Sequence, residues 1–335
     1  MGSSMVLHWI IFLLSGAAIV VAGIRLAPYG EAIGRHTGIG QGWIGLLFLA
    51  TLTSIPEMTT TITGGLIGAP GIAIGNALGS NLFNIGIVAV LDVMLLRRGT
   101  LLSQVRSYHV ISGGVAVLLT GLAVLGMVVP LERAWLGLSP FSWLILGGYA
   151  LGVLLLLRVE RQQVSPEVDE PAASMSLGKA LAGFLFCACV VVIAAIALVT
   201  VSKEISAATG LSSTLMGAIL VAVVTSLPEL AATVGALRIN AFDMAVGNLF
   251  GSNMFNIFTV FLADAAFGEG SILTSLGDGR DDQIIVAICG MILALIAMIA
   301  IAYRSKRRIL GVGVDAALIG AAYVVMTALI VSRGV

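Results

Sequence analysis

Long apolar segments dominate this chain of 335 residues and constrain its fold more than any motif does. A helix needs about 20 predominantly apolar residues to cross the hydrocarbon core of a bilayer. Segments of that length occur ten times, at approximately 7–27, 43–66, 71–95, 108–128, 140–158, 178–201, 211–236, 243–266, 283–303 and 310–332. The sequence therefore predicts an all-α, multi-pass integral membrane protein with ten transmembrane helices in the lipid bilayer.

The composition excludes several other classes of protein. Hydrophobic residues make up 59% of the chain and charged residues only 10%, whereas soluble domains carry about 25% charged residues. Lys plus Arg and Asp plus Glu both number 17, so no basic field exists to hold nucleic acid. The three cysteines lie in apolar stretches, where a small buried side chain is the expected role. We expect no nucleic-acid partner and no cofactor.

A polar stretch at 161–177 divides the ten segments into two sets of five, over residues 1–160 and 178–335. Its prolines and acidic residues predict a linker without a domain of its own. Lys and Arg number 13 in the loops that follow odd-numbered segments and 4 on the opposite side. The positive-inside rule then places the linker in the cytoplasm and both termini outside. The short linker favours a prokaryotic inner membrane.

The two halves contain the same motifs at a constant offset of 172 residues. Residues 53–57, Thr-Ser-Ile-Pro-Glu, recur as Thr-Ser-Leu-Pro-Glu at 225–229, and residues 79–84, Gly-Ser-Asn-Leu-Phe-Asn, recur as Gly-Ser-Asn-Met-Phe-Asn at 251–256. Because each half has an odd number of spans, equivalent helices cross the membrane in opposite directions. This pattern predicts two inverted five-helix repeats, the architecture of alternating-access transporters.

Glu57 and Glu229 lie in the middle of the second and seventh segments. An ionisable group at that depth costs roughly 2.5 to 3.5 kcal/mol, so each acid needs a partner or a function. Neither segment contains a Lys or Arg. One interpretation is a pair of protonated acids bonded to neighbouring helices. We favour the other, a cation site that uses both carboxylates.

A proline precedes each acid. Pro56 and Pro228 lack the N–H of a helical hydrogen bond and clash with the preceding turn, so the second and seventh helices should break there. Carbonyl groups such as those of Thr53 and Thr225 would then be exposed beside the carboxylates. We expect the third and eighth helices to be broken at the midplane as well.

The second repeated motif supplies more oxygen atoms. Residues four apart share one face of a helix, which places Ser80 with Asn84 and Ser252 with Asn256. Carboxylates, carbonyls, hydroxyls and amides together form an all-oxygen set. Such a set suits hard cations such as Ca²⁺ and Na⁺ better than zinc or copper.

The two copies, with cores at about 43–95 and 211–266, resemble the alpha-repeats of the calcium/cation antiporter superfamily. The motif Thr-Ser-x-Pro-Glu with Gly-Ser-Asn-x-Phe is similar to that of its sodium/calcium exchanger branch. The resemblance implies Na⁺/Ca²⁺ antiport by a monomer, with the first and sixth helices sliding over a static core. The implied Ca²⁺ and Na⁺ ligands are Glu57, Glu229 and the carbonyls of Thr53 and Thr225, and the Na⁺ sites would be completed by Ser54, Ser80, Asn84, Ser226, Ser252 and Asn256.

One residue departs from that branch, whose members commonly carry an aspartate at the position of Asn256. Proton coupling is therefore a rival to sodium coupling, and an H⁺/Ca²⁺ antiporter is the alternative function. A channel would need a continuous row of polar residues across the membrane, and an intramembrane enzyme would need a nucleophile paired with a base. The sequence shows one compact polar cluster, so we expect a transporter and not an enzyme.

Two further sets of polar residues are assigned outside the central site. Asp92 and Asp264 lie eight residues beyond Asn84 and Asn256, about 12 Å along a helix, and we expect a capping or entry role. The histidines lie at span ends, and we expect them, His109 included, at the membrane interface.

Overall fold

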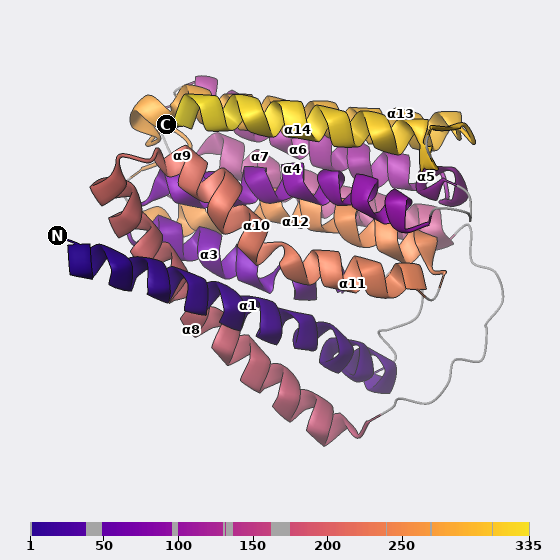
Figure 1. Ribbon diagram of the computed structural model, residues 1–335, viewed down its shortest axis with the longest axis horizontal. Helices are drawn as coiled ribbons and strands as arrows, with labels where there is room; N and C mark the ends of the chain where they lie inside the picture. Colours follow the sequence, from indigo (N-terminus) through magenta and orange to yellow (C-terminus); the bar gives the residue numbers. More distant parts are fainter. Residues whose placement is uncertain are drawn as a thin grey trace.

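The computed structural model describes residues 2–37, 49–95, 100–129, 131, 137–161, 175–238, 240–268, 270–309 and 311–334 (Figure 1). The helices are α1 Gly2–Thr37, α3 Ile55–Leu66, α4 Pro70–Met94, α5 Leu101–Gln104, α6 His109–Val128, α7 Pro140–Arg161, α8 Leu177–Thr209, α9 Ser213–Leu215, α10 Ala222–Thr225, α11 Leu227–Arg238, α12 Phe242–Phe267, α13 Arg280–Tyr303 and α14 Val314–Gly334. A π-helix, η1 Met216–Val221, a 3₁₀ turn, η2 Gly277–Gly279, and two short antiparallel strands, β1 Arg308–Ile309 and β2 Val312–Gly313, complete the elements.

Nine helical stretches in these described ranges are long and apolar enough to cross a membrane. Residues 43–48 of the predicted second span lie outside the described residues, and α3 covers the end of that span. The linker at 161–177 falls largely on residues 162–174, which are likewise outside them. The chain is thus an integral multi-pass membrane protein, as its apolar segments predict.

Several helices extend beyond the apolar segments that predicted them. Helix α8 continues to Thr209, eight residues past the predicted end, and stops where Gly210 adopts φ 76°. Hydropathy delimits the part of a helix in lipid, whereas a glycine in the left-handed region ends the helix itself. Helix α14 begins at Val314 because the strand pair, which turns at Gly311 with φ 87°, occupies the preceding residues.

The prediction of breaks in the third and eighth helices is wrong. Helices α4 and α12 are continuous over 25 and 26 residues. Neither has a proline in its interior, and Pro70 occupies the first turn of α4, where no helical N–H is needed. The glycines of these helices serve packing. Gly79 faces the backbone of Ala218 in η1, and a Cβ atom at Gly75 would lie 3.0 Å from the backbone nitrogen of Ala218.

The helices form layers around the central pair α4 and α12 (Figure 1). Helices α1 and α8 pack against each other along one side, α3 and α11 lie between them and the centre, and α6, α7, α13 and α14 cover the opposite side. The two halves interlock, since α13 packs on α4 and α6 packs on α12. Most of the buried apolar side chains belong to this interlocked region.

The predicted capping role of Asp92 and Asp264 is confirmed. Both side chains are buried and accept hydrogen bonds from segments beyond their own helices. The donors are Leu101 N and Gly313 N to Asp92, at 2.7 Å each, and Ile272 N and Ser142 Oγ to Asp264, at 2.7 and 2.6 Å. Both carboxylates therefore fasten the loops at the ends of the two central helices.

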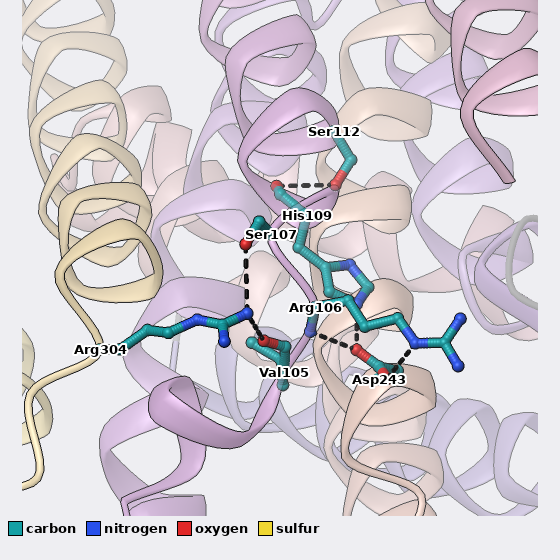
Figure 2. Close-up of polar contacts among 7 residues, drawn as sticks. All are labelled: Val105, Arg106, Ser107, His109, Ser112, Asp243 and Arg304. Atoms are coloured by element: carbon teal, nitrogen blue, oxygen red, sulfur yellow. Dashed lines mark hydrogen bonds and ion pairs between the residues drawn. The ribbon is translucent and has the colours of Figure 1, made fainter. Parts of the chain in front are cut away.

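His109 is the first residue of α6, at the end of a span as the sequence predicted, and its side chain is buried in the protein with 1% of its surface exposed. Its Nε2 lies 3.1 Å from Oδ1 of Asp243, which also accepts the backbone N–H of Arg106 at 2.7 Å (Figure 2). The Arg106 side chain approaches the other carboxylate oxygen at 3.5 Å. Residues at the start of α6 are thus bonded to Asp243 in the first turn of α12. Equivalently, Nε2 of Gln283 in α13 donates to the carbonyl of Gly71 in α4 at 2.7 Å.

Candidate cation site

The two glutamates lie opposite each other at the centre of the helix bundle, and both are completely buried. The hydroxyl of Ser54 donates to Oε1 of Glu229 at 2.7 Å. The hydroxyl of Ser226 donates to Oε1 of Glu57 at the same distance. Since each serine precedes the glutamate of its own half by three residues, these crossed bonds bring the two carboxylates together, as the repeat predicted.

Each glutamate follows a one-residue interruption of its helix, as the prolines predicted. The interruption falls at Ser54, with φ −88° and ψ 11°, and at Ser226, with φ −89° and ψ 5°. These angles lie in the sparsely populated bridge region. Pro56 and Pro228, two residues later, have no N–H to donate to the preceding turn. The same backbone conformation therefore turns both serines toward the opposite half.

Thr53 and Thr225 direct their hydroxyl groups into the protein. Oγ1 of Thr225 lies 3.0 Å from Oδ1 of Asn76, and Oγ1 of Thr53 lies 3.4 Å from Oδ1 of Asn248. Both hydroxyls also lie 3.2 Å from a carbonyl oxygen three residues earlier. The hydrogen of each threonine hydroxyl therefore points to an acceptor within the protein. The predicted cation ligands of these two threonines are their backbone carbonyls.

Asn76 and Asn248 are site-supporting residues that the sequence reasoning missed. Nδ2 of Asn76 donates to the backbone carbonyl of Glu57 at 3.2 Å and to Thr61 at 3.0 Å. Nδ2 of Asn248 donates to Thr233 at 3.3 Å. Asn76 and Asn248 are 172 residues apart, and so are their partners Thr61 and Thr233. That repeat of polar residues within apolar helices was the signal available.

The residues of the second repeated motif complete the central cluster. Ser252 Oγ lies 3.5 Å from Oε1 of Glu229. Ser80, Asn84 and Asn256 are fully buried on α4 and α12. The amide nitrogen atoms of Asn84 and Asn256 donate across the helix pair, at 3.0 and 3.1 Å, which leaves their oxygen atoms on the other side of each amide.

Five buried oxygen atoms of this cluster have no hydrogen-bond partner among the described residues. They are Glu57 Oε2, Glu229 Oε2, Ser80 Oγ, Asn84 Oδ1 and Asn256 Oδ1. A buried polar atom without a partner costs about 1 to 3 kcal/mol, so a set of acceptors of this kind calls for a bound group. Two carboxylates with neutral oxygens match the ligands of Ca²⁺, which takes six to eight oxygens.

The same atoms argue against a transition-metal centre. The part of the chain that the structure describes holds no group of three or more His, Cys, Asp or Glu side chains that could bind a metal. Sites for zinc or copper draw on nitrogen and sulfur ligands. The central cluster is instead assembled from two acids and neutral oxygen donors.

Residues 7–162 and 179–332 match the family described as sodium/calcium exchanger protein. The chain belongs to this family. An uncharacterised membrane protein of Methanocaldococcus jannaschii is 30% identical over 301 residues, which cover 85% of this chain and 91% of the relative. The sodium/calcium exchanger MaX1 of Methanosarcina acetivorans is 30% identical over 291 residues, with coverage of 76% and 81%.

Solved structures of two exchangers resemble this family member over nearly its whole length. The sodium–calcium exchanger NCX_Mj, soaked with Na⁺ and Sr²⁺, has a TM-score of 0.62 at 25% identity, covering 97% of this chain and 99% of its own. The H⁺/Ca²⁺ exchanger CAX has a TM-score of 0.67 at 15% identity, with coverage of 98% and 88%. The latter likeness concerns the fold alone. The family is one of cation antiporters and not of catalytic enzymes.

Proposed function

We propose that this protein exchanges Na⁺ for Ca²⁺ across the membrane by alternating access. The observation that carries the proposal is the set of unpartnered acceptor oxygens around Glu57 and Glu229, in a buried network contributed by both halves. Two negative charges balance one Ca²⁺ ion, and cations that compete for the same carboxylates can drive it out. The name of the relative MaX1 supports sodium as the exchanged ion.

The proposed ligands belong to two groups. Glu57 and Glu229 bind either cation, together with the carbonyls of Thr53 and Thr225. Neutral oxygens complete the Na⁺ sites, since Na⁺ needs less negative charge than Ca²⁺. These come from Ser54, Ser80, Asn84, Ser226, Ser252 and Asn256. Pro56 and Pro228 keep the two helices interrupted at the site.

Alternating access follows from the proposed architecture of ten spans in two inverted five-helix repeats, 1–160 and 178–335. Inverted repeats are equivalent under exchange of the two sides of the membrane, so one arrangement opens inward and its counterpart outward. Helices α1 and α8 pack on each other outside the central layers, which suits a pair that slides over a static core. We place the protein as a monomer in a prokaryotic inner membrane, with both termini outside.

Counter-ion substitution in proteoliposomes tests the proposal. Vesicles loaded with Na⁺ and diluted into Na⁺-free buffer should take up ⁴⁵Ca²⁺, because outward Na⁺ flow drives inward Ca²⁺ flow. Vesicles loaded with choline should take up only the background amount. Equal uptake under the two conditions would show that sodium is not the driving ion.

An H⁺/Ca²⁺ antiporter is the second candidate, and Asn256 is the observation that favours it. With an amide at this position, the central cluster holds two carboxylates, which two protons neutralise as completely as one Ca²⁺ does. In Na⁺-free vesicles with an acidic interior, this candidate predicts ⁴⁵Ca²⁺ uptake driven by the pH gradient alone. Uptake that responds only to Na⁺ removes it.

A further inference from the structure

Four buried asparagine side chains lie between α4 and α12 and are connected by hydrogen bonds. They are Asn81 and Asn84 on α4 and Asn253 and Asn256 on α12, all with 6% or less of their surface exposed. Asn81 and Asn253 are called the anchors here, and Asn84 and Asn256 the ligand amides. The proposed function uses only the ligand amides, so the anchors are polar groups with no assigned role.

The orientation of each anchor is determined by a backbone group. Nδ2 of Asn81 donates to the backbone carbonyl of Asn253 at 3.1 Å, and Nδ2 of Asn253 donates to that of Asn81 at 3.2 Å. A carbonyl accepts hydrogen bonds only, so the NH₂ group of each anchor must face it. The anchor oxygen atoms consequently point toward the ligand amides.

The anchors in turn determine which end of each ligand amide faces the cation. Oδ1 of Asn253 accepts from Nδ2 of Asn84 at 3.0 Å, and Oδ1 of Asn81 accepts from Nδ2 of Asn256 at 3.1 Å. If a ligand amide rotated by 180°, its oxygen atom would face the oxygen atom of its anchor, and its NH₂ group would face the cation site. An NH₂ group has no lone pair for a cation.

We propose that Asn81 and Asn253 are positioning residues that hold the carbonyl oxygens of Asn256 and Asn84 toward the transported cation. The inference rests on the proposed function, because it requires a cation at the central cluster. The unpartnered Oδ1 atoms of both ligand amides are the second observation behind it. Both ligand amides then present their oxygen atoms to the site, although each amide has a donor at its other end.

Replacement of one anchor should disturb one ligand amide and leave the other in place. In Asn253→Leu the side chain of Asn81 keeps its bond to the backbone of residue 253, so Asn256 stays oriented while Asn84 loses its acceptor. In Asn81→Leu the roles are exchanged. Leucine has the same branched shape as asparagine, and a small cavity of about 10 Å³ lies beside both anchors.

A matched rescue distinguishes positioning from a merely structural role. An aspartate presents oxygen in either orientation, so it needs no anchor. Asn84→Asp should restore Ca²⁺ binding to Asn253→Leu but not to Asn81→Leu, and Asn256→Asp should restore Asn81→Leu but not Asn253→Leu. The two rescues add the same charge, so charge alone predicts no difference between matched and mismatched pairs.

The measurement is the equilibrium affinity of each purified full-length variant for Ca²⁺, in Na⁺-free detergent solution. Each leucine variant should bind Ca²⁺ at least about tenfold more weakly than the wild type, and each matched double variant as tightly as its aspartate single variant. Thr120→Val is the control, because Thr120 lines the same cavity but bonds within its own helix; its affinity should not change. If a leucine variant does not fold, alanine at the same position removes the same amide.

The outcomes separate this inference from the proposed function. Wild-type protein without saturable Ca²⁺ binding contradicts both. Wild-type binding with unchanged affinity in both anchor variants contradicts the positioning role alone. Equal rescue by matched and mismatched aspartates also overturns it, since the added charge would then explain the recovery.

Discussion

The two oxygen atoms of each central glutamate have different surroundings. Oε1 accepts a 2.7 Å bond from a serine of the opposite half, and Oε2 has no partner among the described residues. A carboxylate held at one oxygen is oriented before its ligand arrives, which reduces the entropy lost on binding. The free oxygen remains available to a cation.

Glu57→Gln and Glu229→Gln should each abolish Ca²⁺ transport. The glutamine oxygen can keep the serine bond, and its NH₂ group then takes the position of Oε2, where it faces the cation without charge or lone pair. Transport is measured as ⁴⁵Ca²⁺ uptake, and size-exclusion chromatography verifies folding. Glu204→Gln on the exposed surface of α8 is the matched control and should transport normally. Normal transport by either central variant would show that its residue is not a ligand.

Ser54→Ala and Ser226→Ala should weaken Ca²⁺ binding to a similar extent, by roughly tenfold. Each substitution removes a hydrogen bond of the same length, to Glu229 in the first variant and to Glu57 in the second. The glutamate then keeps its charge but is no longer held in one orientation. Calorimetric titration of the two variants measures the effect. A large loss in one variant with none in the other would show that the two halves contribute unequally.

The repeat identified the proposed ligand residues in the sequence but not the residues that support them. Glu57 and Ser54 stand out because each recurs at an offset of 172 residues inside an apolar segment. Asn81 recurs in the same motif, but as the neighbour of Ser80 it points about 100° away around the helix, off the face assigned to the site. Its partner is the backbone of another helix, which no pattern within one segment reveals.

At the scale of helices, hydropathy located the spans but not their ends or their breaks. The interruptions at Ser54 and Ser226 follow from prolines and were predictable. The continuity of α4 and α12 was not recognised, because glycine-rich helices are stabilised by close packing on neighbours. The helix ends depend on contacts between distant residues, such as those of Asp92 and Asp264.

Asp264→Asn should destabilise the protein by about 1 to 3 kcal/mol. The carboxylate accepts bonds from Ile272 N, Ser139 N and Ser142 Oγ, and an amide turns an NH₂ group toward at least one of these donors. Thermal unfolding in detergent reports the change. Asp281→Asn at an exposed side chain is the control. Equal unfolding temperatures for the two variants would refute the capping role.

Gly79→Ala should destabilise the fold by about 1 to 3 kcal/mol or more. A methyl group there would meet the backbone of Ala218, and backbone cannot rotate away as a side chain can. Gly147→Ala on α7 is the matched control, since nothing lies within 4 Å of the added atom. The unfolding temperature should fall for Gly79→Ala only; if both variants melt alike, α4 and η1 pack less closely than the structure shows.

At the scale of the whole molecule, the two halves are joined by the contacts that build the site. Helices α4 and α12 pack on each other, and each packs on a helix of the opposite half. Neither half therefore holds a complete cluster. The choice of counter-ion was not predictable from the sequence, because the proposed carboxylate ligands could serve Na⁺ or H⁺ and the sequence does not give the positions of the surrounding oxygen atoms.

The most direct test of the central claim, one cation shared by two glutamates, is the stoichiometry of Ca²⁺ binding by calorimetric titration of purified protein. We expect one Ca²⁺ per chain in the wild type, competition by added Na⁺, and no binding in the Glu57→Gln/Glu229→Gln double variant. Unchanged stoichiometry and affinity in that double variant would contradict the account.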